Sequence, residues 1–112
     1  MVMAKDYKKT KQYKELKADL MRQLEVNNTS GKYFEDMVND YMDLWVIKNQ
    51  LIDDVAERGV ITTYKNGANQ YGTKKNDSLD TLLKVNSQML RILTQLKIEA
   101  NEPQPDTDDD EL

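Results

Sequence analysis

The sequence of 112 residues contains no cysteine and no histidine. Without cysteine the chain cannot form disulfides or zinc–thiolate sites, and without histidine it lacks the usual base of serine and cysteine nucleophiles. Catalysis would have to rest on carboxylates alone. We therefore expect a protein that is not an enzyme and that holds no metal ion and no cofactor.

Long apolar runs are also missing from the sequence. No window approaches the roughly 18 apolar residues of a membrane-spanning helix, and the opening MVMAKDYKKTKQYK lacks an apolar stretch of signal-peptide length. We expect a cytoplasmic protein that makes no contact with membranes. With 38% apolar and 32% charged residues, one Trp and one Phe, the chain has little material for a core, which favours packing against a partner.

The formal net charge of −4 conceals a strong asymmetry along the chain. Residues 1–24 carry seven basic and three acidic side chains, whereas residues 25–98 carry nine basic and ten acidic side chains. Residues 99–112 carry seven acidic side chains, no basic one and both prolines. We therefore expect a basic N-terminal segment, a nearly neutral middle and an acidic tail that is disordered.

Residues 30–58 show the apolar periodicity of a long amphipathic helix. At 100° per residue, their apolar side chains fall within an arc of about 140°. The members of this arc are Phe34, Met37, Val38, Tyr41, Leu44, Trp45, Leu51, Ile52, Val55 and Ala56. Such a helix measures roughly 43 Å, too long for one small subunit to cover. Thr29 or Ser30 is expected to cap its start and Gly59 its end.

Residues 79–98 form a second amphipathic segment, whose apolar arc of about 180° needs two neighbours. The members of this arc are Leu79, Leu82, Leu83, Val85, Met89, Leu90, Ile92, Leu93 and Leu96. Asp77 or Ser78 is expected to cap the helix. A third, weaker helix is expected over residues 5–25, with an apolar edge formed by Tyr13, Leu16, Leu20, Met21 and Leu24.

A polar segment, VITTYKNGANQYGTKKNDSLD at residues 60–80, joins the two long helices. Its first five residues are β-branched or aromatic, and Asn66-Gly67 is the strongest signal for a two-residue hairpin turn. The return arm, residues 68–75, contains few strand-forming residues. A small β-hairpin and an ordered loop therefore both remain open.

These patterns predict an all-α fold, in which a long antiparallel helical hairpin is joined by the Gly/Asn-rich segment. We expect a basic N-terminal helix over residues 1–29, an oligomerising hairpin core over residues 30–98 and the acidic tail over residues 99–112. The apolar arcs are too wide for one hairpin to bury, which predicts a homo-oligomer. The expected contacts between subunits are Tyr41, Leu44, Trp45, Lys48, Ile52 and Leu90, and Leu44, Trp45 and Leu90 are expected to be buried in the assembly.

Two features of the long helix have competing interpretations. Lys48 lies in the middle of the apolar arc, where its stem can pack while its charge reaches water, or where it can pair with an acidic residue of a neighbouring subunit. Asp53 and Asp54 invite a metal or acid–base interpretation. Adjacent helical side chains point about 100° apart, however, and no third ligand converges on them. We therefore expect neither chemistry.

Three segments of the chain follow one another in a characteristic order. They are YFEDMVNDYMDLWVIKNQLIDDVAERGV at 33–60, TYKNGANQYGTKKNDSL at 63–79 and LLKVNSQMLRILTQLKI at 82–98. This order of a long helix, a glycine, a loop with lysine and glycine, and a leucine-rich helix resembles the short small-subunit terminases of tailed bacteriophages and prophages.

The sequence departs from the pattern of that family at two places. Asn76-Asp77 stands where proline is more usual, and Leu96-Lys97-Ile98 stands where Leu-Gly-Leu is common. The resemblance implies a non-enzymatic DNA-packaging factor that forms oligomers, often rings. It also implies a protein of the host cell cytoplasm that binds double-stranded viral DNA and recruits the large ATPase-nuclease subunit.

Two lysine clusters are the candidates for DNA contact, because basic side chains outnumber acidic ones only there. They are Lys5, Lys8, Lys9, Lys11 and Lys14 near the N-terminus, and Lys65, Lys74 and Lys75 in the joining segment. Residues 1–29 have room for one helix and no helix-turn-helix, so phosphate contact is expected rather than base reading. The same absence disfavours a dimeric DNA-binding regulator. The alternative function is a helical adaptor or structural oligomer without a DNA role, which would lack salt-sensitive DNA binding.

Overall fold

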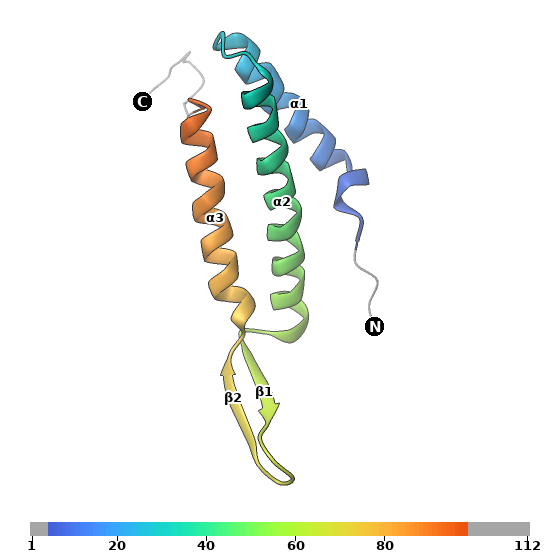
Figure 1. The fold of residues 1–112 in the computed structure, drawn as a ribbon. Coiled ribbons are helices and arrows are strands. Elements are labelled where there is room, and N and C mark those ends of the chain that lie inside the picture. The colour runs from blue at the N-terminus through green and yellow to red at the C-terminus, as the bar shows by residue number, and fades with distance from the viewer. Residues whose placement is uncertain (1–4, 99–112) are drawn as a thin grey trace, which may run out of the picture.

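The computed structural model describes residues 5–98 as three α-helices, a 3₁₀ helix and a two-stranded sheet (Figure 1). In chain order the elements are η1 (Tyr7–Lys9), α1 (Lys11–Val26), α2 (Lys32–Arg58), β1 (Ile61–Lys65), β2 (Tyr71–Lys75) and α3 (Asp77–Gln95). Helices α2 and α3 form an antiparallel pair, and α1 lies against α2. The predicted helical class is confirmed as a mostly helical fold. The expected acidic tail over 99–112 lies outside the described residues, as do residues 1–4.

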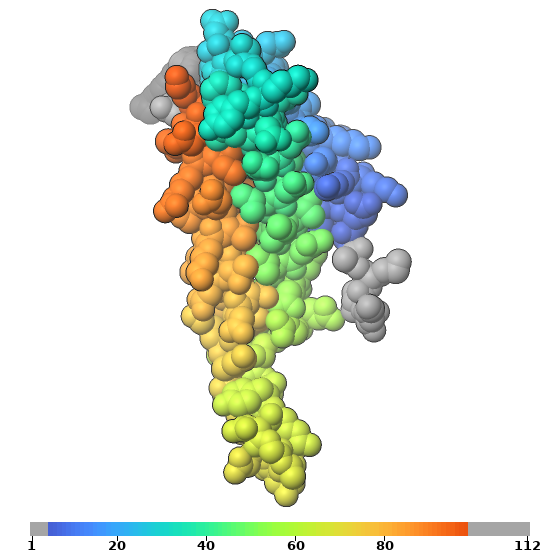
Figure 2. Space-filling view, in the orientation of Figure 1, coloured from blue at the N-terminus to red at the C-terminus, as the bar shows by residue number. Residues whose placement is uncertain are grey.

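The molecule is elongated, with principal extents of 62 × 40 × 24 Å. Its radius of gyration is 19.1 Å, compared with about 13 Å for a compact domain of about 100 residues. Helix α1 covers α2 at one end, whereas the strands extend beyond the other end of the α2–α3 pair as a narrow projection (Figure 2). One subunit therefore leaves much of its helical surface uncovered.

The segment between α2 and α3 is a β-hairpin, which decides between the two open interpretations. Strands β1 and β2 pair antiparallel, from Ile61 opposite Lys75 to Lys65 opposite Tyr71. The connection between them spans five residues, 66–70, and not the two residues that the Asn-Gly signal favours. The amide of Asn66 donates to the carbonyl of Gln70 at 2.7 Å and closes this connection.

The expected caps of α2 are wrong at its start and right at its end. Thr29 instead ends α1, because its amide donates to the carbonyl of Leu24 at 2.8 Å. This bond completes a left-handed helix ending, in which Asn28 has φ 57°. Helix α2 then begins after Gly31, with no side-chain cap. At the other end, Gly59 adopts φ 86° and stops the helix as predicted.

The expected cap of α3 is also wrong, by one residue. Asn76, not Asp77 or Ser78, caps the helix, and its side-chain oxygen accepts a hydrogen bond from the Ser78 amide at 2.9 Å. The carboxylate of Asp77 instead pairs with Lys74 of β2 at 3.3 Å. The capping residue of α3 is therefore Asn76, one position before the two residues that the sequence pattern favours.

The predicted N-terminal helix is interrupted near its start. Residues Tyr7–Lys9 form the 3₁₀ helix, and Thr10 has an extended backbone. The hydroxyl of Thr10 accepts a hydrogen bond from the Tyr13 amide at 3.2 Å and so caps α1. The expected helix over 5–25 is therefore a 3₁₀ turn followed by an α-helix that ends at Val26.

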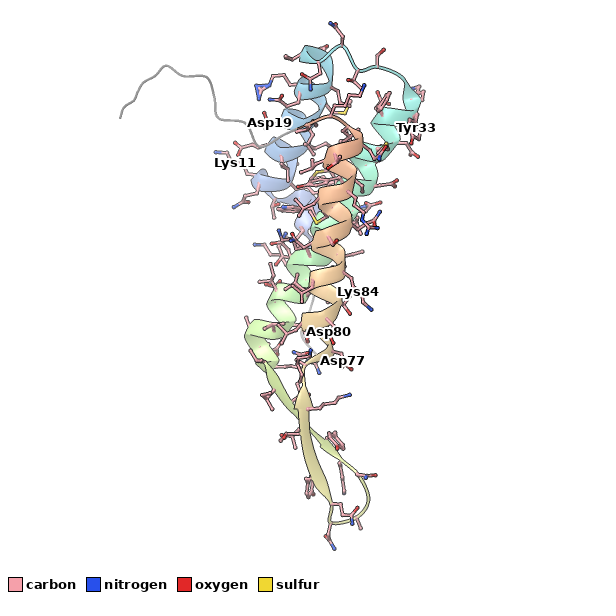
Figure 3. The ribbon with its side chains drawn as sticks, turned by 90° about the vertical axis from the view of Figure 1, so that its left-hand side faces the viewer. Lys11, Asp19, Tyr33, Asp77, Asp80 and Lys84 are labelled. Atoms are coloured by element: carbon pink, nitrogen blue, oxygen red, sulfur yellow. The ribbon has the colours of Figure 1, made fainter. Side chains whose placement is uncertain are left out.

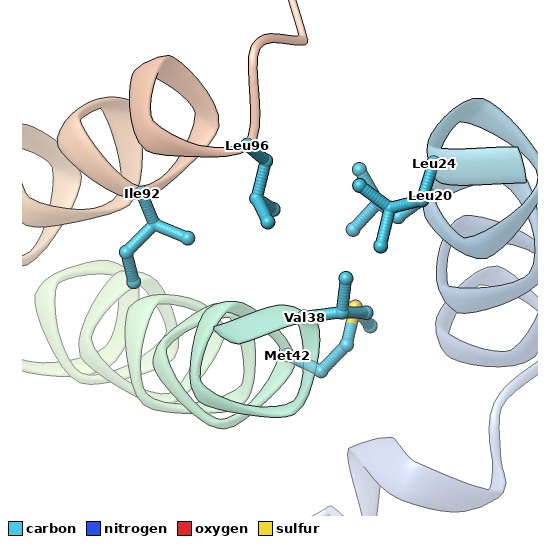
Figure 4. Close-up of a cluster of buried hydrophobic side chains, with 6 residues drawn as sticks. All are labelled: Leu20, Leu24, Val38, Met42, Ile92 and Leu96. Carbon is cyan, nitrogen blue, oxygen red and sulfur yellow. The ribbon is translucent and has the colours of Figure 1, made fainter. Parts of the chain in front are cut away.

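The buried core lies where all three helices meet, at the end away from the strands (Figure 4). Its members are Leu20, Leu24, Val38, Met42, Ile92 and Leu96. The predicted apolar arc of α2 includes Val38 but omits Met42, which is fully buried. The apolar side chains predicted for α3 do not all face this core. Ile92 and Leu96 do, whereas Leu90 is 58% exposed.

Candidate nucleic-acid interface

A partly buried polar junction holds the β-hairpin to the two long helices. Its centre is the carboxylate of Asp54, which accepts hydrogen bonds from the Ser78 hydroxyl at 2.6 Å and the Asn76 amide at 3.2 Å. The Arg58 guanidinium donates to both oxygens of the same carboxylate at 2.7 Å. Arg58 first, and then Ser78, hold the pKa of the Asp54 carboxyl well below its usual range.

Asn76 links this junction to the hairpin itself. Its side chain is fully buried and also donates to the Gly59 carbonyl at 2.9 Å. Its backbone amide donates to the Val60 carbonyl at 2.7 Å. Both ends of the hairpin are therefore tied to the same point, which fixes the direction in which the strands leave the helices.

The hairpin projects a basic surface. Residues 59–76 contain three lysines and no acidic residue. Lys74 and Lys75, near the helices, pair with Asp77 at 3.3 Å and Asp80 at 2.9 Å, at the start of α3 (Figure 3). The pKa of Lys75 is raised by its hydrogen bond to Asp80, and the pKa of Asp80 is lowered by the same bond.

Lys65 lies further along the hairpin than these two ion pairs. Its ammonium is 5.9 Å from the ring centroid of Tyr71, its cross-strand partner. It makes no ion pair with any residue of the described range, 5–98. Of the three predicted lysines of this segment, Lys65 therefore carries the charge that remains most available to a ligand.

The N-terminal lysines are exposed and weakly paired. The ammonium of Lys8 lies 3.7 Å from Asp43, that of Lys9 lies 3.8 Å from Asp6, and that of Lys11 lies 3.8 Å from Glu15. Lys5 lies over the ring of Tyr7 at 5.1 Å, and Lys14 is exposed. Exposed pairs of this kind are worth little, so these lysines can exchange their partners for phosphates.

The structure does not bring the two lysine clusters together. The Tyr7 hydroxyl donates to Asp53, and the Tyr7 and Tyr13 rings pack on Trp45 with centroids 5.9 and 5.8 Å away. The hydrogen bond to Asp53, and then burial, raise the pKa of Tyr7. These contacts hold the N-terminal segment beside the middle of α2, whereas the hairpin begins beyond its end (Figure 1). The chain thus offers two separate basic surfaces.

The residues expected between subunits have different environments in the single chain. Tyr41, Leu44 and Trp45 are half-buried and pack against the core of their own subunit. Lys48 is half-buried too, whereas Ile52 and Leu90 are 41% and 58% exposed. Trp45 is partly covered by two tyrosines, a contact that helical periodicity cannot reveal because they come from a separate N-terminal segment.

The adjacent carboxylates Asp53 and Asp54 do not converge on a common site. Asp53 bonds to Tyr7 while Asp54 bonds to Arg58, Asn76 and Ser78, so the two adjacent carboxylates serve different partners. No group of three potential metal ligands occurs in this range. No helix in the same range is long and apolar enough to cross a membrane.

The described residues thus form an elongated helical subunit from which a lysine-bearing β-hairpin projects. A family model described as phage terminase, small subunit, matches residues 10–101. The chain belongs to this family and is a non-catalytic DNA-packaging factor. No curated protein and no solved structure matches it.

Proposed function

We propose that this small terminase subunit assembles into a homo-oligomer, binds double-stranded viral DNA and recruits the large terminase subunit in the host cell cytoplasm. The observation that carries the DNA-binding part is the acid-free segment 59–76, which forms a projecting hairpin with three lysines. Family membership supports the partners, since packaging joins viral DNA to the enzyme that moves it.

Assembly is supported by apolar side chains that the subunit leaves in water. Leu83 and Leu90 are 69% and 58% exposed on α3. They are seven residues apart, so they lie on one face of the helix two turns from each other. Ile52 on α2 is exposed as well. Burial of these side chains against another copy would stabilise an assembly.

The DNA contacts that we propose are Lys5, Lys8, Lys9, Lys11 and Lys14 of the N-terminal segment, and Lys65, Lys74 and Lys75 of the hairpin. An assembly repeats each cluster once per subunit, so weak phosphate contacts add to a useful total affinity. The acidic face of α2 carries Asp36 and Asp40, which are exposed and would repel DNA. We therefore place the duplex against the lysine clusters and away from that face.

Titration of labelled duplex DNA at several salt concentrations tests this proposal. Affinity should fall steeply between about 50 and 200 mM salt, because phosphate contacts release counterions. Replacing Lys8, Lys9 and Lys11 by Gln should flatten the slope. Replacing Lys32, Lys84 and Lys97 by Gln removes the same charge elsewhere and should change the slope less.

The alternative function, a helical adaptor without a DNA role, makes the opposite prediction for the same titration. The wild-type oligomer would then show no salt-dependent binding to duplex DNA. Pull-down of the large subunit by the same preparation would still succeed. That pair of results would overturn the DNA-binding part of the proposal and leave the protein partner standing.

A further inference from the structure

The β-hairpin has two faces that differ in character. Side chains alternate along paired strands, so the register places Thr63, Lys65, Tyr71 and Thr73 on one face, beyond Ile61 and Lys75 at the end near the helices. We call these four residues the Thr63 face. Thr62, Tyr64, Gly72 and Lys74 lie on the opposite face.

The Tyr64 ring dominates the opposite face of the hairpin. Tyr64 stands directly opposite Gly72, and a Cβ placed on Gly72 would lie 2.6 Å from the Tyr64 ring atom Cζ. The ring therefore occupies the space that any side chain at position 72 would need. Gly72 and Thr62 are half-buried. This face consequently presents mainly the Tyr64 ring, which is 45% exposed, and Lys74, which is paired with Asp77.

The Thr63 face is open to solvent. All four of its residues are exposed, and Tyr71 is 67% exposed. Its polar groups are two hydroxyls on a directly opposed Thr63–Thr73 pair, the Lys65 ammonium and the Tyr71 hydroxyl. No acidic residue lies between positions 59 and 76. These four residues thus present hydrogen-bonding groups and one positive charge, beyond the Lys75–Asp80 ion pair near the helices.

We propose that the hairpin enters the major groove of duplex DNA with the Thr63 face toward the base edges. This inference rests on the proposed DNA-binding function and adds base reading to the phosphate contact expected from the sequence. Lys65 is suited to guanine O6 and N7, and the two threonines offer hydroxyls to bases and methyl groups to thymine. The opposite face with Tyr64 points out of the groove.

The dimensions of the hairpin match those of the groove. Paired strands lie about 4.8 Å apart, and the major groove is about 12 Å wide, which admits a two-stranded ribbon with its side chains. Five residues per strand give a length of about 17 Å. The hairpin also stands clear of the helices, so its approach to DNA is not blocked by them (Figure 2).

Charge decides between DNA and a second copy of the hairpin as the occupant. Both strands have an unpaired edge, which could in principle pair with another chain. A second hairpin would, however, bring three more lysines and no acid to the same place. Duplex DNA supplies the opposite charge and neutralises the lysines on contact.

The test begins with selection of tightly bound duplexes by the wild-type protein from a random-sequence pool. The selected duplexes are then remade with 7-deazaguanine, which lacks the N7 acceptor of the major groove, or with inosine, which lacks the N2 donor of the minor groove. We expect 7-deazaguanine to weaken binding by about tenfold, while inosine leaves the affinity unchanged.

Hairpin variants then locate the reading face. Lys65→Gln should abolish the difference between guanine and 7-deazaguanine, and Thr63→Val with Thr73→Val should lower affinity for the selected duplexes relative to the starting pool. Valine keeps the branched shape that favours a strand. Thr62→Val on the opposite face and Lys84→Gln on α3 are the matched controls and should retain both properties.

The possible results separate this inference from the function on which it rests. If the wild type binds duplexes with salt dependence but treats guanine and 7-deazaguanine alike, groove reading is wrong and phosphate binding stands. If the Thr63-face variants change the mass of the oligomer and not its DNA preference, the hairpin is a contact between subunits and the inference is overturned. If the wild type binds no duplex at all, the proposed function fails together with the inference.

Discussion

The side-chain amide of Asn76 donates to the carboxylate of Asp54 at 3.2 Å, across 22 residues of sequence. This contact joins the last turns of α2 to the cap of α3 at the root of the hairpin. Arg58 donates to the side-chain oxygen of the same Asn76 at 3.1 Å. The fully buried Asn76 side chain thus bonds to the Ser78 amide, the Gly59 carbonyl and both members of the Asp54–Arg58 ion pair. All of its polar groups are satisfied in this way.

Replacing Asn76 with alanine should destabilise the subunit by about 1–3 kcal/mol, because a helix cap is lost and buried partners are left unpaired. Chemical denaturation followed by circular dichroism measures this change. Asn86→Ala, at an exposed position of α3, is the matched control and should change stability by less than about 0.5 kcal/mol. If both substitutions changed the free energy of unfolding equally, the hydrogen bonds of Asn76 would contribute nothing to stability.

The same junction predicts sensitivity to acid. The folded-state pKa of Asp54 lies below that of the unfolded chain, so its contribution is fully present above the unfolded value of about 4 and is lost as pH falls toward the folded value. We expect the free energy of unfolding to decrease as pH drops below about 4. Urea denaturation at a series of pH values measures how steeply the free energy of unfolding depends on pH.

The variant Asp54→Asn separates this carboxylate from the other acidic groups. Its stability should depend less steeply on pH below about 4, although some slope should remain because the pKa of Asp80 is also lowered by Lys75. Asp36→Asn, at an exposed site on α2, should keep the wild-type slope. A wild-type slope in Asp54→Asn would contradict the assignment.

The sequence predicted the long helices because each repeats apolar residues over many turns. It did not predict the junction, since Asp54 and Arg58 at the end of α2 meet Asn76, the cap of α3, and no period connects these polar residues across the hairpin. The helix caps failed for a related reason. Thr29 and Asp77 are good capping residues, but the first ends α1 and the second pairs with Lys74.

The candidate site was predictable only in part. The lysines of both clusters can be found by counting charged residues along the sequence, which needs no knowledge of contacts. Such counting cannot tell that Lys74 and Lys75 are paired with α3 whereas Lys65 is not. Nor can it distinguish the two hairpin faces, since these depend on the register that places Tyr64 over Gly72.

The departure from Leu-Gly-Leu at residues 96–98 has a structural consequence that can be measured. Lys97 adopts φ 62°, and Ile98 donates to the Leu93 carbonyl at 2.9 Å in a left-handed helix ending that favours glycine. Lys97→Gly should therefore stabilise the protein by about 0.5–1 kcal/mol. Gln95→Gly, inside the last turn of α3, should destabilise it by about 1 kcal/mol. Thermal unfolding tests whether Lys97→Gly raises the melting temperature and Gln95→Gly lowers it.

Shortening apolar side chains to alanine should destabilise the protein more at residues buried within one subunit than at residues exposed on it. Met42 is fully buried, so Met42→Ala should cost about 2–5 kcal/mol. Ile47→Ala, at a position five residues further along α2 that is 41% exposed, should cost less. Denaturation at a protein concentration where the oligomeric state is unchanged measures both values. A larger loss for Ile47 than for Met42 would contradict the core described here.

Assembly through the uncovered face of α3 gives the last prediction. Leu83→Ser with Leu90→Ser removes two exposed apolar side chains that share a helix face, so the folded subunit should persist while the oligomer weakens. Light scattering should report more than two subunits for the wild type and a smaller mass for the double variant at the same concentration. Val26→Ser alters a residue that is 70% exposed at the end of α1 and should leave the mass unchanged. A monomeric wild type at micromolar concentration would refute the proposed assembly, and an unchanged mass in the double variant would place the interface on another face.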